Sequence, residues 1–127
     1  MSMREYGIRG FGVCFDKVAN YFDRKKAVEW LLLKEEECDG RSNAEIMEEI
    51  LQLQDSVIEF AWTDETSYIL IYEILPWQMS HKDWKGLETE QLAKEYMWDK
   101  LHEFFDDRLI QEDFYYMLDI VDDTYLG

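Results

Sequence analysis

The alternation of apolar and polar positions is clearest in the middle of the chain. The runs 56–63 and 67–75 are rich in Ile, Val, Tyr, Phe and Trp, and the polar segment 64–66 separates them. Two such runs joined by a short polar segment are typical of a β-hairpin. Pro76 ends the second run, because proline cannot donate a hydrogen bond to a neighbouring strand.

A further strand is predicted over residues 5–15, where β-forming residues are interrupted by Gly7, Gly10 and Gly12. Glycine within a strand marks a bulge or the close approach of another backbone. Gly10 and Gly12 also form a Gly-x-Gly segment, but no Lys-Ser/Thr follows it. The pattern therefore favours a structural explanation over a phosphate-binding loop.

Helical periodicity predicts the elements of the N-terminal half. A helical turn or two is expected over 16–22, and Asp23 is placed to cap a helix through Glu37. The inward residues of this helix would be either Ala27, Trp30, Leu31 and Leu33 or Val28 and Leu32. Ser42 then has the spacing of a capping box with Glu45. This next helix would bury a stripe of three residues, Ile46, Ile50 and Leu53.

Helical spacing returns in the C-terminal half. A helix over 88–106 would present one broad apolar face, formed by Leu92, Ala93, Tyr96, Met97, Leu101, Phe104 and Phe105. Residues 112–125 fit either a helix or a buried strand, and we interpret them as helix because Phe114, Met117 and Val121 are spaced for one. Trp30, Trp62 and Trp98 lie on periodic elements and are expected in the core.

These elements predict an α+β fold. It would contain a small, mostly antiparallel sheet, formed by the N-terminal strand and the central hairpin, with about four helices packed on one face. We expect residues 1–127 to form a single globular domain, because the chain has one proline and no Gly/Ser-rich linker. An aromatic content of 16% separates the sequence from the disordered class.

Charge is distributed unevenly along the sequence. Residues 1–34 hold 7 Lys/Arg against 4 Asp/Glu, whereas residues 35–127 hold 6 against 25, and the net charge is −16. Such a field repels nucleic acid and anionic membranes and attracts cationic surfaces. We therefore expect no direct binding of nucleic acid or membranes. No apolar stretch reaches the ~18 residues of a membrane helix, and the N-terminus lacks a signal-peptide core, so a cytoplasmic location is expected.

The acidic residues of the 88–106 region follow helical spacing. Successive carboxylates four residues apart rise about 6 Å along a helix, which is comparable to the spacing of charge along a nucleic-acid backbone. Such an array could occupy a cationic groove; the alternative is a solvated face that keeps a small protein soluble. The predicted partner-binding carboxylates are Glu95, Asp99, Glu103, Asp106 and Asp107.

No motif predicts a catalytic residue, a metal site or a cofactor. His81 and His102 lie in no known nucleophile or metalloprotease motif, and Cys14 and Cys38 lack the paired spacing of zinc ligands. The acidic segments 35–39 and 119–123 lack the pattern of a calcium-binding loop. Glu59 and Glu73 interrupt apolar strands and could do acid/base chemistry, but exposure on edge strands explains them more simply.

The leading functional hypothesis is a small, non-enzymatic inhibitor or adaptor that binds a basic, nucleic-acid-binding protein, such as a phage-defence nuclease. It follows the logic of anti-restriction and anti-CRISPR proteins by analogy, and no shared motif carries it. The alternative is an accessory interaction domain, phage or bacterial, that binds through Trp77 and Trp84 in the aromatic loop 77–86. An enzyme of unknown chemistry is a third possibility. The sequence leaves the oligomeric state open.

Overall fold

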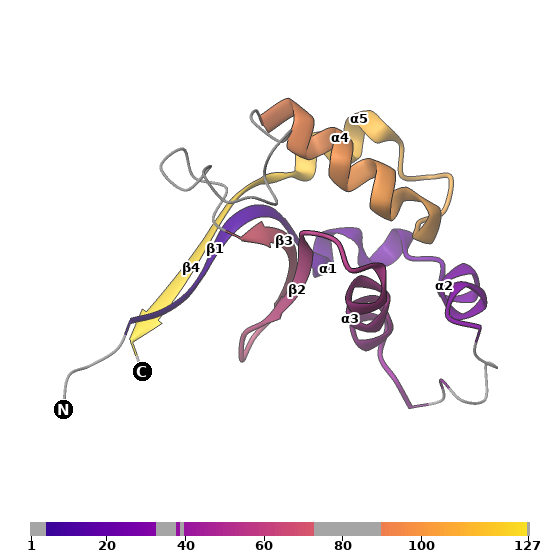
Figure 1. The fold of residues 1–127 in the computed structure, drawn as a ribbon, viewed down its shortest axis with the longest axis horizontal. Helices are drawn as coiled ribbons and strands as arrows, with labels where there is room; N and C mark the ends of the chain where they lie inside the picture. The colour runs from indigo at the N-terminus through magenta and orange to yellow at the C-terminus, as the bar shows by residue number, and fades with distance from the viewer. Residues whose placement is uncertain (1–4, 33–37, 39, 73–89, 127) are drawn as a thin grey trace.

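A four-stranded antiparallel sheet organises the fold (Figure 1). It is seen in a computed structural model that describes residues 5–32, 38, 40–72 and 90–126. The strands lie in the order β2-β3-β1-β4. Their bounds are Glu5–Cys14 for β1, Ile58–Trp62 for β2, Ser67–Tyr72 for β3 and Asp119–Leu126 for β4.

Helices fill the two long connections between strands. Between β1 and β2 lie α1 (Phe15–Val18), the 3₁₀ turn η1 (Ala19–Tyr21), α2 (Arg24–Trp30) and α3 (Asn43–Gln54). Between β3 and β4 lie α4 (Glu90–Leu101), the 3₁₀ turn η5 (His102–Phe104) and α5 (Gln111–Met117). The described elements therefore have the β-α-β-β-α-β order of a split β-α-β arrangement, in which β3 lies between β1 and β2. The predicted α+β fold is confirmed.

The strand register puts one row of apolar residues under the helices. Val13 pairs with Ile69, Phe11 with Ile71, and Ile71 in turn with Ile58, so that these side chains share one face of the sheet. Every long helix buries residues in the same cluster: Ala27 and Val28 of α2, Ile46, Met47, Ile50 and Leu51 of α3, Ala93, Met97 and Leu101 of α4, and Phe114 of α5. Phe15 and Val18 of α1 belong to the same cluster, so the sheet and the helices α1 to α5 share one core.

A smaller apolar cluster lies on the opposite face of the sheet. It consists of Ile8, Ala61 and Leu70, with Tyr68 and Val121 packed against it. Gly12 pairs with Leu70 where β1 and β3 approach closely. A Cβ on Gly12 would lie 2.6 Å from the Leu70 Cα and closer still to the Ile69 carbonyl oxygen. The predicted close approach of another backbone is confirmed.

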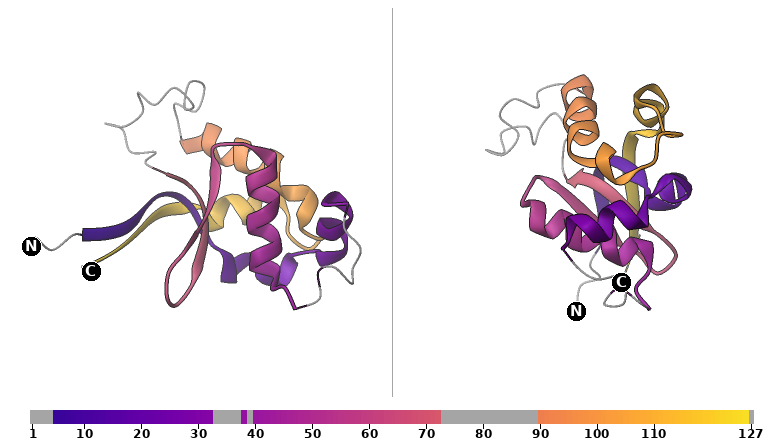
Figure 2. Two further views of the ribbon diagram at one scale, coloured as in Figure 1. Left: turned by 60° about the horizontal axis from the view of Figure 1, so that its bottom comes forward. Right: turned by 90° about the vertical axis from the view of Figure 1, so that its right-hand side faces the viewer.

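The outer halves of β1 and β4 pair with each other. β4 pairs along β1 from Glu5 to Gly12, whereas the pairing of β1 with the described residues of β3 covers Gly10–Cys14. The outer ends of β1 and β4 lie side by side, away from the helices, in both figures (Figures 1 and 2). Within the described residues, these halves form an antiparallel ribbon.

Two helix predictions are wrong in detail. Asp23 caps α2 as predicted, but α2 ends at Trp30 and Leu32 adopts a left-handed backbone with φ 59°, which no α-helix continues through. Leu32 is consequently 92% exposed. In α3 the buried stripe is centred on Ile46, Met47, Ile50 and Leu51, so Leu53 falls at its margin and is 62% exposed.

The C-terminal segment is a helix followed by a strand, so the prediction of helix throughout 112–125 is wrong. Helical spacing holds for α5, where Phe114 is buried, and it ends at Met117. β4 then begins at Asp119 and pairs with Gly12 at the start of eight consecutive pairs with β1. The free edge of β1 decides the outcome, because it supplies hydrogen-bond partners from the other end of the sequence.

Candidate acidic interface

Helix α4 is fixed on the core by three residues of one face. Ala93, Met97 and Leu101 are fully buried, and the ring of Trp98 packs on Phe114 of α5 with centroids 5.5 Å apart. The predicted helix over 88–106 is thus confirmed from Glu90 to Leu101, and a 3₁₀ turn continues it to Phe104. A helix held this firmly keeps its outer side chains in a defined arrangement.

The outer side of α4 and η5 carries the three predicted carboxylates Glu95, Asp99 and Glu103, all exposed. Glu95 accepts a hydrogen bond from the Gln91 side chain at 3.3 Å. Within the part of the chain that the structure describes, no Lys or Arg forms an ion pair with any of the three. Their spacing of four residues corresponds to about 6 Å along the helix axis.

The lysines of α4 are engaged elsewhere. Lys94 Nζ lies 3.6 Å from Glu90 Oε1, and Lys100 Nζ lies over the ring of Tyr96 at 5.7 Å. The ammonium groups of both lysines therefore contact residues that do not belong to the carboxylate row. The outer row therefore keeps its negative charge, which a cationic surface could neutralise.

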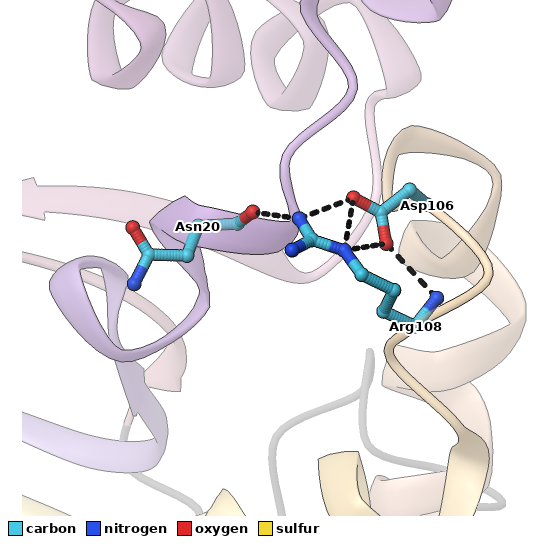
Figure 3. A network of polar contacts seen from close by, with 3 residues as sticks. All are labelled: Asn20, Asp106 and Arg108. Carbon is cyan, nitrogen blue, oxygen red and sulfur yellow. Dashed lines mark hydrogen bonds and ion pairs between the residues drawn. The ribbon is translucent and has the colours of Figure 1, made fainter.

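Asp106 has a different environment from the other four carboxylates of the predicted set. Its two oxygens accept hydrogen bonds from Arg108, at 3.1 Å from Nε to Oδ1 and at 2.8 Å from NH2 to Oδ2 (Figure 3). Arg108 NH2 also donates to the carbonyl oxygen of Asn20 at 2.6 Å. The Arg108 hydrogen bonds hold the pKa of Asp106 below its usual value. Asp106 thus joins η5 to η1, whereas Asp107 is exposed.

Backbone hydrogen bonds reinforce this junction. Asp106 N–H donates to the Tyr21 carbonyl at 2.7 Å, and Asp23 N–H donates to the Phe104 carbonyl at 2.8 Å. The Arg108 guanidinium also lies over the Tyr21 ring at 5.5 Å. The C-terminal end of the carboxylate row is therefore attached to the first helical segment of the chain.

Other candidate residues from the sequence fall in different places. Trp77 and Trp84, like His81 and Glu73, lie outside the described residues. His102 is exposed, its ring stacks on Trp98, and its Nδ1 lies 2.8 Å from the Trp98 carbonyl oxygen.

In the described ranges 5–32, 38, 40–72 and 90–126, no group of three or more His, Cys, Asp or Glu side chains could hold a metal ion. None of the helices in these ranges is both long and apolar enough to cross a bilayer. Cys38 is a buried free thiol, and the half-buried Cys14 Sγ lies 3.1 Å from Thr66 Oγ1.

One site was missed by the sequence analysis. The expectation that Trp62 lies in the core is wrong, since its side chain is 46% exposed at the end of edge strand β2. It borders a cleft of about 460 Å³ between the hairpin turn, α1 and the start of α3. Strand periodicity could not reveal this, because Trp62 is on the core-facing side of β2, as Ile58 is, but stands at the end of the strand, where it contacts Glu48 of α3 and remains partly exposed.

Comparison with known proteins supplies no relative. No protein-family model, curated protein or solved structure matches the chain.

Proposed function

We propose that the chain is a small, non-enzymatic inhibitor or adaptor that binds a basic, nucleic-acid-binding protein through the outer row of α4 and η5. The observation that carries the proposal is the fixed row of exposed carboxylates Glu95, Asp99 and Glu103, without ion-pair partners among the described residues, on a chain of net charge −16. Charges carried by a helix fixed on the core bind without the cost of ordering their backbone. The row resembles a nucleic-acid backbone in that its negative charges follow one another along a line.

The first experiment asks whether a partner's nucleic-acid site is the target. The immobilised chain is incubated with a nuclease-treated fraction of basic proteins, and bound proteins are eluted either with duplex DNA or with a salt gradient. Mimicry predicts that duplex DNA releases the bound protein and that its affinity falls steeply with salt. Binding that resists both DNA and salt would contradict it.

A charge reversal locates the surface on the protein. Replacing Glu95→Lys together with Asp99→Lys should weaken the complex by more than tenfold, about 1.4 kcal/mol, chiefly through slower association. The matched control is Glu29→Lys with Glu59→Lys, which makes the same charge change at exposed positions on α2 and β2. Equal losses from the two variants would mean that only net charge matters. No loss from either would move the binding surface to Trp77 and Trp84.

A further inference from the structure

The cleft beside the hairpin turn combines an aromatic wall with negative charge. Its described lining includes Trp62, Asp16, Asp64 and Glu65, together with hydroxyl groups of the 63–67 turn and the start of α3. None of the described lining residues is Lys, Arg or His. The carboxylates of the cleft therefore suit a cation, and its indole ring suits a cation that is planar.

Trp62 is held in one orientation. Its indole Nε1–H donates to Glu48 Oε2 at 2.7 Å, and its ring packs on Phe60 with centroids 5.1 Å apart. These contacts fix the ring from the side of α3 and β2 while nearly half of the side chain stays exposed. An exposed, immobilised tryptophan is typical of the anchor positions of protein interfaces.

The turn that carries two of the carboxylates is also well fixed. Thr63 N–H donates to the Thr66 carbonyl at 2.8 Å, and Thr63 Oγ1 accepts from Thr66 N–H at 3.0 Å. The Thr66 hydroxyl lies 3.3 Å from Asp16 Oδ2 and connects the turn to α1. Asp64 and Glu65 are exposed on this turn and line the cleft.

We propose that this cleft binds an arginine side chain of the basic partner. The inference rests on the proposed function for the basic character of that partner. A guanidinium can stack on an indole ring while its N–H groups bond to carboxylates in its own plane, and the cleft offers both kinds of group. A lysine ammonium is a point charge that gains less from a flat wall. The cleft would thus supply specificity that the carboxylate row on α4 lacks.

The test uses blocked arginine, N-acetyl-arginine methylamide, as the probe and ¹⁵N-labelled full-length chain. On titration, the Trp62 indole N–H and the amides of 63–67 should shift together and saturate in the millimolar range. Blocked lysine should bind at least fivefold more weakly. Replacing Trp62→Leu should abolish that difference, because it removes the stacking surface and leaves the carboxylates in place.

A pair of matched double variants separates the cleft from general acidity. Asp64→Asn with Glu65→Gln should weaken blocked-arginine binding at least fivefold, and Glu95→Gln with Asp99→Asn, which removes the same two charges on α4, should leave it unchanged. Equal losses from both, shifts spread over all acidic residues, or equal binding of lysine would overturn the proposal. The titration with blocked arginine needs no partner protein. It therefore tests the cleft even if the α4 variants show that the proposed function is wrong.

Discussion

Two missing side chains, at Gly10 and Gly12, determine how closely β1 and β3 can approach. At Gly12 a Cβ would lie 2.6 Å from the Leu70 Cα, which is a backbone atom and cannot rotate away, and a Cβ at Gly10 would clash with the Ile71 carbonyl oxygen. Gly40 offers a contrast, because no atom of the described residues, its chain neighbours aside, lies within 4 Å of its hypothetical Cβ, whereas its φ is 82°. Gly10 and Gly12 are therefore required by space and Gly40 by backbone conformation.

Replacing Gly12→Ala should lower the free energy of unfolding by about 3 kcal/mol, the upper end of the usual cost of overpacking, because the two strands must separate. Gly40→Ala should cost only about 1 kcal/mol, the strain of a left-handed alanine. Urea unfolding of both variants at neutral pH measures the difference. Equal losses would show that the strands yield without cost.

Asp106 and Arg108 form a hydrogen-bonded ion pair that links η5 to η1. The hydrogen bonds from Arg108 lower the pKa of Asp106 below its usual 3.8 and raise the pKa of Arg108. A carboxyl group whose pKa is lowered on folding stabilises the fold above its unfolded pKa, and this contribution is lost as the pH falls through the folded pKa. The junction between η1 and η5 should therefore weaken in acid.

Replacing Asp106→Asn should lower the urea midpoint at pH 6, because the amide cannot form the charge-assisted pair with Arg108. The gap between this variant and the unmodified chain should narrow as the pH falls below 3.8, where the unmodified carboxyl also becomes neutral. Urea midpoints at pH 6, 4 and 3 measure the gap. A gap that stays constant with pH would indicate that Asp106 acts through shape alone.

At the scale of elements, α3 begins with the predicted capping box. Glu45 N–H donates to Ser42 Oγ at 3.1 Å, and Ser42 N–H donates to Glu45 Oε1 at 3.2 Å. The hydrogen bond from the Ser42 backbone holds the pKa of Glu45 below its usual value. Four buried residues of α3 belong to the main core, so the stability of this helix is shared by the whole domain.

Replacing Ser42→Ala should cost about 1 kcal/mol, since one backbone N–H of the first turn loses its acceptor. Ser42→Asp should retain most of that stability, because its carboxylate accepts the same bond and favours the helix N-terminus. Thermal unfolding of the two variants tests the pair. If alanine and aspartate behave alike, the cap does not limit the stability of the domain.

Elements specified by local sequence were predicted, and those specified by distant partners were not. The hairpin and the Ser42 capping box depend on neighbouring residues, and both are present. β4 depends on the edge of β1, more than 100 residues away, which no local pattern records. The same division holds for the site: helical spacing placed Glu95 and Asp99 on an exposed side, whereas the hydrogen bond from Arg108 to Asn20 needs the tertiary fold.

At the scale of the whole molecule, the net charge of −16 sets a background repulsion. Salt screens such repulsion over a distance of about 10 Å at 0.1 M. The few described ion pairs lie at or near the surface, where they contribute little. Repulsion among the acidic side chains should therefore outweigh the attraction within the ion pairs, although salt screens both.

Raising NaCl from about 20 mM to 500 mM should increase the melting temperature, because the screened interactions are mostly repulsive. The Glu29→Lys, Glu59→Lys variant, which changes the net charge from −16 to −12, should melt higher at low salt and gain less from added salt. Differential scanning calorimetry measures both. A melting temperature that falls with salt would show that attractive pairs dominate.

The ribbon of β1 and β4 determines how the domain responds to mechanical force. Glu5 pairs with Leu126 at its outer tip, so traction on these two strands from that end acts across the hydrogen bonds of one residue pair at a time. Such loading unzips a ribbon and does not shear it. The domain should yield at low force along this direction, beginning with the outer half of β1, which among the described residues pairs with β4 alone.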